Sequence, residues 1–189
     1  MNHMGEMGRG GGTAPLCVLE SFLGPIAVFG DRAGLRRICI GHRDVGYPSL
    51  EGEPPPWLHE VASSLRDFLV GREVGREVVE RLLASPRLTD FQKRVLGVVA
   101  GIPRGETLTY GEVAARIGCP RAARAVGRAL GSNPFPLLFP CHRVVRKGGD
   151  PGGYGPGVAL KARLLAWEGA TPPCGNGKTG EDDAAPQRT

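Results

Sequence analysis

Short apolar runs separated by turn residues open the chain. Residues 16–22, 26–29 and 35–40 are mostly apolar, and glycine, proline and charged residues stand between them. Turn residues at this close spacing predict an antiparallel meander of three strands. The next stretch, residues 41–56, is rich in glycine and proline, which predicts a loop.

Apolar residues then recur at helical spacing. This pattern predicts an amphipathic helix that packs on the small sheet, with an apolar face made of Trp57, Leu58, Val61, Leu65, Phe68 and Leu69. Residues 71–88 leave two alternatives open, because the apolar positions over 78–83 suit a strand or a helix. The first half of the chain shows no residue pattern with an identifiable chemistry.

Two capping boxes organise the second half. Residues 89–92 read Thr-Asp-Phe-Gln and residues 109–112 read Thr-Tyr-Gly-Glu, so a helix is predicted to begin after each threonine. Gly118-Cys119-Pro120 ends the second of these helices. Proline is favoured in the first turn of a helix, so a third helix is predicted over residues 121–130.

A short glycine-containing turn between the last two helices predicts a helix-turn-helix. Small and apolar residues share one face of the third helix, and Arg121, Arg124 and Arg128 lie along its edge. These arginines could face DNA phosphates, or they could form an exposed basic edge on a packed helix. The residue types alone leave both interpretations open.

The remaining segments complete an α+β fold. Residues 146–154 are basic and rich in turn residues, like the wing of a winged helix, and a final helix is predicted to end at Glu168-Gly169. We therefore expect an N-terminal domain over 13–88 and a C-terminal domain over 89–169. The polar ends, 1–12 and 170–189, are expected to be disordered tails.

Composition narrows the class of protein. Hydrophobic residues make up 41% of the chain and charged residues 23%, as in soluble globular proteins, and no apolar run approaches a membrane span. The glycine-rich start does not resemble a signal peptide, so we expect a cytoplasmic protein in a prokaryote or a nuclear one in a eukaryote. A net charge of +5 permits an anionic partner. None of the five cysteines forms a CxxC pair, so no metal site is expected.

Cys141 and His142 are the candidate chemical groups. A free thiol is only a few per cent thiolate at neutral pH, but a nearby imidazole can take its proton and a carboxylate can orient that imidazole. In an extended segment neighbouring side chains point in opposite directions, so a bridging water could connect the two. The alternative is an inert cysteine buried in the core.

The sequence Pro140-Cys141-His142-Arg143-Val144 resembles the active-site signature of the 6-O-alkylguanine-DNA alkyltransferases. The resemblance continues in the same order through residues 89–92, 102–107, 110–114, 124–127, 133–134, 153–154, 161, 164–165 and 168–169. The first 88 residues match only in the order of their predicted strands and helix.

This resemblance implies a ribonuclease-H-like N-terminal domain with a three-stranded antiparallel sheet and a helix, followed by a mostly helical winged helix-turn-helix domain. It implies DNA repair by direct transfer of the alkyl group of 6-O-alkylguanine, and of 4-O-alkylthymine, to Cys141. The nucleotide would be flipped out of double-stranded DNA from the minor groove. No cofactor and no membrane are implied, and a monomer is expected. Because a thioether is not hydrolysed as a thioester is, each molecule is expected to react once, irreversibly.

The resemblance also implies roles for individual residues. Cys141 would accept the alkyl group, His142 would activate it through a water, and Glu168 would orient the imidazole. Asn133 would hold the turn that presents the cysteine, and Tyr110 would give a proton to the leaving guanine.

Further residues would bind the base or the DNA, or support the site. The base would be held by Val144, Tyr154, Gly155 and Pro156. DNA would be contacted by Arg124, Tyr110, Gly111, Arg121, Arg128 and Lys147, with Arg124 filling the vacated place in the base stack. Arg143 and Lys161 would give structural support.

Some points differ from the family pattern or stay open. Many relatives carry small residues after the wing tyrosine, whereas Pro156 here narrows that rim and bears on the entry of bulky adducts. Cys17 and Cys39 could face each other across neighbouring strands, which would allow a disulfide. Two other functions remain as alternatives: a non-catalytic sensor of alkylated DNA, and a winged-helix regulator in which Cys141 belongs to the core.

Overall fold

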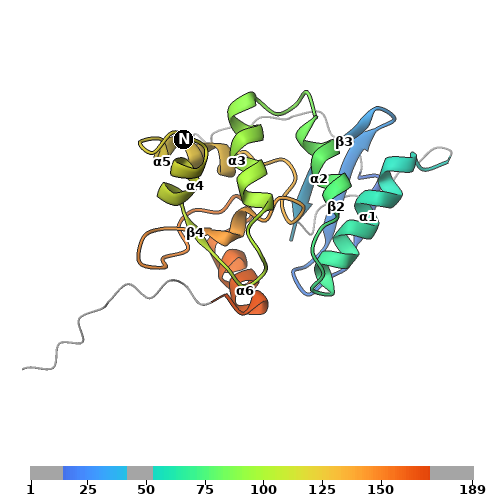
Figure 1. The fold of residues 1–189 in the computed structure, drawn as a ribbon. Helices are drawn as coiled ribbons and strands as arrows, with labels where there is room; N and C mark the ends of the chain where they lie inside the picture. Colours follow the sequence, from blue (N-terminus) through green and yellow to red (C-terminus); the bar gives the residue numbers. More distant parts are fainter. Residues whose placement is uncertain (1–14, 42–52, 171–189) are drawn as a thin grey trace, which may run out of the picture.

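A computed structural model describes residues 15–41 and 53–170 (Figure 1). Strands β1 (Cys17–Leu19), β2 (Ile26–Asp31) and β3 (Gly34–Ile40) form an antiparallel sheet in the order β1-β2-β3, which confirms the predicted meander. The segments expected to be tails fall almost wholly on residues outside the described part.

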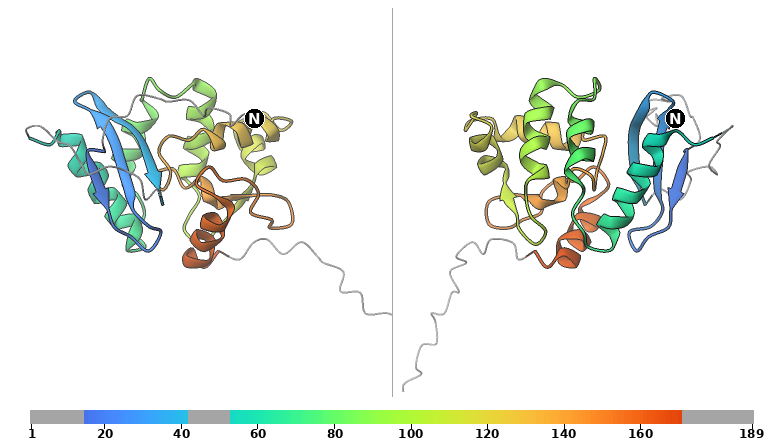
Figure 2. Two further views of the ribbon diagram at one scale, coloured as in Figure 1. Left: turned by 180° about the vertical axis from the view of Figure 1, so that it is seen from behind. Right: turned by 45° about the vertical axis from the view of Figure 1, so that its right-hand side comes forward.

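Helix α1 (Pro56–Leu69) lies across one face of the sheet (Figure 2). Its start suits Pro56, which occupies the first turn, where a missing N–H costs no helical hydrogen bond. Leu58, Val61, Leu65 and Phe68 are its buried apolar side chains, and Phe68 contacts the rings of His142 and Trp167 in the other half. Each such side chain contributes roughly 1.5–3 kcal/mol when it is fully removed from water.

Helix α2 (Arg76–Leu83) settles the ambiguous stretch. Val78 and Leu82 are buried one helical turn apart while Glu80 between them is exposed, whereas an alternating strand would place all three on the same face. On the exposed side, Arg76 Nε donates to Glu80 Oε1 at 2.6 Å, a favourable pair at the i,i+4 spacing of a helix.

The C-terminal half begins with α3 (Asp90–Ala100) and α4 (Tyr110–Arg116). Both capping boxes are present: Thr89 Oγ1 accepts from the Gln92 N–H and Thr109 Oγ1 from the Glu112 N–H, each at 3.2 Å. Helix α5 (Ala123–Gly131) packs against both α3 and α4. The helix-turn-helix is therefore built from α4 and α5.

The predicted start of the third helix was wrong. A hydrogen-bonded turn, in which the Ala122 N–H donates to Cys119 O at 2.8 Å, precedes α5 and delays it to Ala123. Pro120 and Arg121 lie in this turn. Arg121 therefore does not belong to the arginine row of the helix, which retains Arg124 and Arg128.

After α5 the chain runs through a buried loop into a 3₁₀ turn, η1 (Cys141–Arg143). The expectation of an extended backbone at Cys141-His142 was therefore wrong. Strand β5 (Val144–Val145) then pairs in parallel with β4 (Leu108–Thr109), and α6 (Val158–Glu168) ends at Gly169, as predicted. The wing segment between β5 and α6 contains a basic turn, which is closed by a hydrogen bond from the Arg146 N–H to Asp150 O at 2.8 Å.

The possible disulfide is ruled out by the order of the strands. Cys17 stands opposite Val28 and Cys39 opposite Ala27, so both pair with β2, which separates the two outer strands. Cys17, Cys39, Cys119 and Cys141 are free thiols, and Cys174 lies outside the described residues.

The two halves share one continuous hydrophobic core. The outer edge of β3 meets the loop before Cys141, where the Ile38 N–H donates to Pro134 O at 2.9 Å. Arg163 on α6 also donates to the carbonyl of Phe22, near the end of the β1–β2 turn. The sheet half is thus fixed directly beside the segment that presents the cysteine. Within the described ranges, no helix is long and apolar enough to cross a membrane.

Candidate active site around Cys141

A buried loop presents Cys141 at the first position of η1. Phe135, Leu137 and Phe139 are fully buried in this loop, and Leu137 has φ +72°. Among the residues that the structure describes, Leu137 is the one non-glycine with a positive φ, a conformation that costs about 1 kcal/mol or more. The surrounding core holds this strained turn, and the Cys141 side chain is left 5% exposed.

Asn133 ties the loop to the thiol. Its Nδ2 donates to the Sγ of Cys141 and to Phe139 O, both at 3.2 Å, and its Oδ1 accepts from the Phe135 N–H at 3.0 Å. Burial raises the pKa of the Cys141 thiol, and the bond from Asn133 and the charge of Lys161 work in the opposite direction. The amide thus both fixes the turn and favours the thiolate.

His142 is fully buried next to the thiol. Its Nε2 lies 3.1 Å from Glu168 Oε1, but the alignment is poor, and neither ring nitrogen makes a hydrogen bond within the described part of the chain. Burial is the main reason that the pKa of His142 is lowered, and Glu168 only partly offsets it. The resting imidazole is therefore neutral at pH 7 and able to take a proton.

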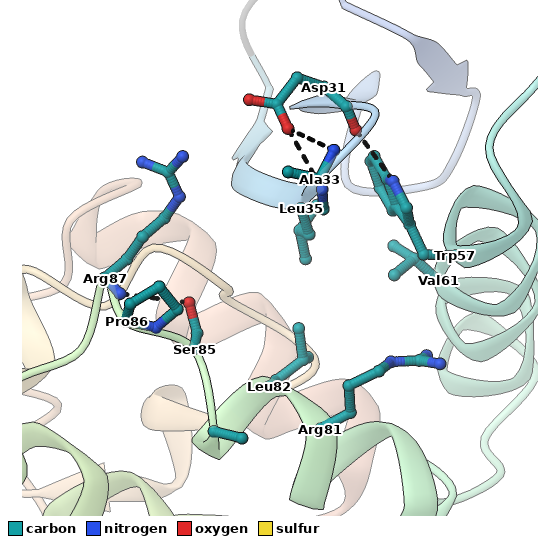
Figure 3. A pocket seen from close by; sticks show the side chains of 12 residues that line it. Asp31, Ala33, Leu35, Trp57, Val61, Arg81, Leu82, Ser85, Pro86 and Arg87 are labelled. Atoms are coloured by element: carbon teal, nitrogen blue, oxygen red, sulfur yellow. Dashed lines mark hydrogen bonds between the residues drawn. The ribbon is translucent and has the colours of Figure 1, made fainter.

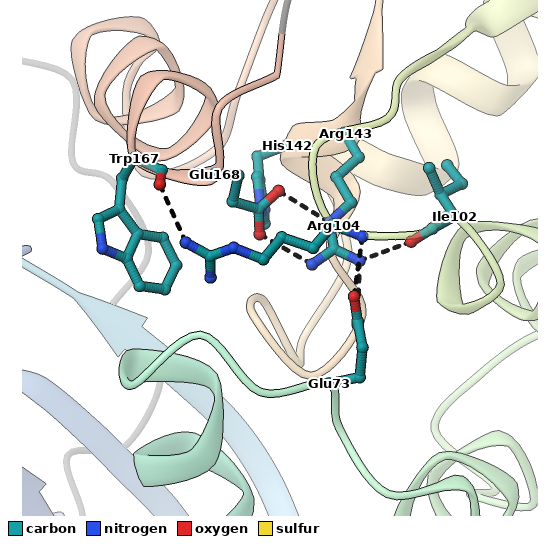
Figure 4. A network of polar contacts seen from close by, with 7 residues as sticks. All are labelled: Glu73, Ile102, Arg104, His142, Arg143, Trp167 and Glu168. Carbon is teal, nitrogen blue, oxygen red and sulfur yellow. Dashed lines mark hydrogen bonds and ion pairs between the residues drawn. The ribbon is translucent and has the colours of Figure 1, made fainter.

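Glu168 and Arg143 form a buried, two-pronged ion pair (Figure 4). Arg143 Nε donates to Glu168 Oε2 at 2.9 Å and Nη2 donates to Oε1 at 2.8 Å. Burial alone would raise the pKa of Glu168, but His142 and Arg143 bring it down to about 2. The carboxylate beside His142 is therefore ionised at every physiological pH.

A second carboxylate reaches the same arginine from the other half of the molecule. Glu73 lies between α1 and α2, and its Oε2 accepts from Arg143 Nη1 at 3.2 Å. That nitrogen also donates to Ile102 O at 2.5 Å. The sequence analysis missed Glu73, which belongs to no motif. The only available signal was indirect, because a buried arginine needs acceptors for several N–H groups.

Lys161 and Tyr110 lie on the other side of the thiol. Lys161 Nζ donates to Val144 O at 2.5 Å and lies 5.7 Å from the centre of the Tyr110 ring. Burial lowers the pKa of Lys161 to about 8, so most of it carries a charge at pH 7. The Tyr110 hydroxyl donates to Gly153 O at 3.4 Å, and burial raises its pKa, so it keeps its proton.

Two neighbouring cavities meet at Gly131. One, of about 180 Å³, is bounded by Cys141 and Asn133, by Leu130, Pro136, Gly155 and Pro156, and by Ile38, Cys39 and Ile40 of β3. The other, of about 470 Å³, is bounded by Ala123, Gly127, Gly153, Tyr110, Arg124, Arg146 and Tyr154. The ring centre of Tyr154 lies 6.5 Å from that of His142, and its buried hydroxyl has no partner among the described residues.

Half of the expected base- and DNA-contacting residues line these two cavities: Tyr110, Arg124, Tyr154, Gly155 and Pro156. Val144 is fully buried, with its N–H donating to Cys141 O and its carbonyl held by Lys161. Arg128, Lys147 and Gly111 are exposed on α5, on the basic turn and on the first turn of α4. Arg121 stays apart, beside Cys119 and Pro120 in the turn before α5.

A further cavity, of about 300 Å³, lies in the sheet half between β2, α1 and the end of α2 (Figure 3). Several of its polar groups are already engaged: the indole of Trp57 donates to Asp31 O at 2.9 Å, and Arg81 pairs with Glu60. Its lining residues include no thiol and no histidine. The chemistry therefore belongs to the cavities beside Cys141.

No metal-binding group was found in the ranges 15–41 and 53–170, where three or more histidine, cysteine or acidic side chains nowhere come together. His3 and His42 fall outside these ranges. The groups around Cys141 are those of acid–base and nucleophilic chemistry.

Comparison with known proteins identifies the family to which the chain is similar. Residues 90–170 match the family described as 6-O-methylguanine DNA methyltransferase, DNA binding domain. A methylated-DNA–protein-cysteine methyltransferase of Mycobacterium tuberculosis is 51% identical over 155 residues, which cover 82% of this chain and 92% of the relative. One from Methanothermobacter thermautotrophicus is 49% identical over 123 residues, covering 65% and 68%. The crystal structure of Mycobacterium tuberculosis OGT in complex with DNA matches with a TM-score of 0.62 and 34% identity, over 80% of this chain and 91% of that one.

A helix-turn-helix with a buried cysteine, histidine and glutamate beside it defines the class, an alkyl-transferring DNA repair protein. The chain belongs to the methylated-DNA–protein-cysteine methyltransferase family. This assignment supports alkyl transfer and not the alternative of a non-catalytic sensor.

Proposed function

We propose that this chain repairs double-stranded DNA by transferring the alkyl group of 6-O-alkylguanine to the Sγ of Cys141. The observation that carries the proposal is the surroundings of that sulfur. It accepts a hydrogen bond from Asn133, it adjoins a neutral imidazole paired with an ionised carboxylate, and it opens on a cavity next to the helix-turn-helix. The relative solved in complex with DNA supports the choice of substrate.

The first step is activation of the thiol. His142 is neutral and its ring nitrogens are buried without a hydrogen bond in the described region, a situation that proteins usually resolve with an ordered water. Through such a water the imidazole takes the proton of Cys141. Glu168 stabilises the imidazolium, while Asn133 and Lys161 stabilise the thiolate.

The second step is transfer of the alkyl group. The thiolate sulfur attacks the alkyl carbon, the carbon–oxygen bond breaks, and its electron pair goes to the guanine oxygen. Tyr110, which keeps its proton and borders the neighbouring cavity, donates that proton to the guanine. The product is a thioether on Cys141 and an unmodified guanine, so one protein molecule repairs one lesion.

The reacting atom must first leave the base stack, which costs a few kcal/mol. Arg124 is exposed on α5 and borders the cavity that contains Tyr110 and Tyr154, a position from which it fills the vacated stack. Approach from the minor groove suits a repair protein, because that groove carries little sequence information.

The same reaction extends to 4-O-alkylthymine, whose alkyl group is bound in the same way to an exocyclic oxygen of the base. We also propose that the protein acts as a monomer. Because its substrate is DNA, we expect it with the nucleoid in the cytoplasm of a prokaryote, or in the nucleus of a eukaryote.

A titration tests the proposal. Increasing amounts of protein are mixed with a fixed amount of duplex containing one 6-O-methylguanine, and the remaining lesion is measured after the reaction stops. We expect loss of the lesion in a one-to-one ratio with the wild-type protein, none with Cys141→Ser, and full loss with the control Cys17→Ser. Repair by Cys141→Ser, or many lesions repaired per molecule, would contradict the proposal.

A further inference from the structure

Glu73, between α1 and α2, brings an acidic side chain of the sheet half into the charged network behind the active site (Figure 4). Its two oxygens hold two separate segments: Oε2 accepts from Arg143 Nη1 at 3.2 Å, and Oε1 accepts from the Arg104 N–H at 2.8 Å. Arg104 is itself fixed, because its Nη2 donates to Trp167 O at 2.9 Å and its guanidinium lies 3.8 Å above the Trp167 ring.

We propose that Glu73 is a positioning residue for the alkyl transfer: acting through Arg143, it keeps the Glu168 carboxylate available to His142 while the imidazole carries the proton of Cys141. The inference rests on the proposed function and adds to it a role for the sheet half. Glu73 touches neither the thiol nor the imidazole, so its effect passes through the arginine.

Competition for one oxygen is the first reason. Glu168 Oε1 accepts from Arg143 Nη2 at 2.8 Å and lies 3.1 Å from His142 Nε2, so the guanidinium and the imidazole share it. Glu73 holds the Nη1 edge of the same guanidinium on the side away from that oxygen. Without Glu73, only the Ile102 carbonyl holds this edge of the guanidinium, and Arg143 can move further onto the Glu168 oxygen that His142 needs.

Charge balance is the second reason. His142 is faced by Glu168 and Lys161 from α6, by Arg143 and its neighbour Cys141 in η1, by the Tyr154 ring from the wing segment, and by the Phe68 ring from α1. In the activated state the negative charge of the thiolate is balanced by the positive charge of Lys161. The imidazolium of His142 and the guanidinium of Arg143 then carry two positive charges, and Glu168 supplies only one negative charge. Glu73 supplies the missing negative charge. Burial works against the guanidinium, yet Glu168 and Glu73 raise the pKa of Arg143 above its usual value.

Glu73 is exposed to water, with 56% of its side chain accessible, so its effect is expected to be moderate. The substitution Glu73→Gln keeps the shape and an oxygen acceptor for the Arg104 N–H, and replaces the charged oxygen that faces Arg143 with an uncharged amide NH2. The imidazolium–thiolate state then becomes less favourable, so the thiol ionises at a higher pH. We expect this midpoint to rise by about half a pH unit, and alkyl transfer at pH 7 to slow by about threefold, the scale of one half-exposed charge.

The thiol is best followed without DNA. Iodoacetamide is added across a range of pH, and the rate of modification is measured on the peptide that contains Cys141. The control is Glu77→Gln, four residues along the chain, where an exposed carboxylate makes no hydrogen bond or ion pair with the rest of the described chain. Glu73→Asp, which keeps the charge on a shorter side chain, is expected to recover part of the shift.

A shift of the midpoint in Glu73→Gln, with none in Glu77→Gln, supports the role of Glu73. Equal profiles in both variants and the wild type would overturn it, and so would equal shifts in both variants, which indicate only a long-range charge effect. A lower melting temperature with an unchanged pH profile would also overturn it, because Glu73 would then be purely structural. Failure of the wild-type protein to take a methyl group from DNA would instead overturn the proposed function.

Discussion

Cys141 combines deep burial with reactivity, and its neighbours reconcile the two. A thiol in an apolar environment resists ionisation, so burial alone would make it inert. Asn133 donates to the sulfur and Lys161 places a positive charge nearby, while His142 stays neutral until it takes the proton. The same burial that raises the pKa of the thiol removes water and strengthens each of these interactions.

Replacing Asn133 with alanine tests the link between the loop and the sulfur. The change removes one of the two donors to the Phe139 carbonyl, leaves the Phe135 N–H without its partner and frees the strained turn at Leu137. We expect the free energy of unfolding to fall by about 1–3 kcal/mol. Alkyl transfer is expected to slow roughly 10- to 100-fold, because the sulfur is no longer held in place.

Urea unfolding and single-turnover kinetics measure these two effects. Ser132→Ala is the matched control, since that side chain bonds Gln92 and the carbonyls of α5 but not the cysteine loop. Full activity of Asn133→Ala would contradict the prediction, because the turn would then hold the cysteine without the side-chain amide of Asn133.

The lowered pKa of Glu168 predicts how the free energy of unfolding depends on pH in acid. Its pKa is about 2 in the folded protein against an ordinary value of 4.5, so the unfolded chain takes up a proton first as the pH falls. The stabilisation is therefore complete above about pH 4.5 and is lost between that pH and about pH 2. We expect the variant Glu168→Gln to be less stable than the wild type at pH 7 and to approach it near pH 2. Urea unfolding over this pH range measures the difference, and a constant gap would contradict the assignment.

At the scale of elements, short sequence motifs predicted those helix boundaries that are set by interactions between neighbouring residues. Thr89 and Thr109 fixed the starts of α3 and α4, because a capping box is made within four residues. The signal from Pro120 failed, since a hydrogen-bonded turn competed with the first turn of α5. The parallel pairing of β4 with β5 could not be predicted either, because it joins two-residue strands far apart in the sequence.

Substitutions on helix α5 test how the protein holds the nucleotide out of the DNA stack. Arg124→Ala is expected to slow repair of a lesion in duplex DNA by about tenfold or more, because an extruded base costs a few kcal/mol to hold out of the stack. Its reaction with the free 6-O-alkylguanine base should be unchanged, since no stack is disturbed. Arg128→Ala, on the same helix, is the control and should weaken duplex binding without this difference between substrates.

Rates on both substrates, measured at several salt concentrations, distinguish these effects. If Arg124→Ala repairs duplex and free base as fast as the wild type, its role in extrusion is wrong.

At the scale of the whole molecule, the site is completed by a half whose sequence shows no chemistry. Cys141, His142, Asn133 and Glu168 could be selected from motifs, because they belong to the segment that resembles a known family. Glu73 and the wall of β3 could not, because packing brings them to the site from sequence that carries no motif. The Ile38 N–H bond to Pro134 O shows how closely the sheet supports the loop of the cysteine.

The central claim is transfer of an alkyl group to Cys141, and intact-protein mass spectrometry tests it most directly. The protein is mixed with a short duplex that contains one 6-O-methylguanine, and the modified peptide is then mapped. We predict a gain of one methyl group per molecule, located on the peptide containing Cys141. The methylated base in the DNA should become an ordinary guanine. An unchanged protein mass in the presence of bound lesion DNA would contradict the account and leave a sensor of alkylated DNA.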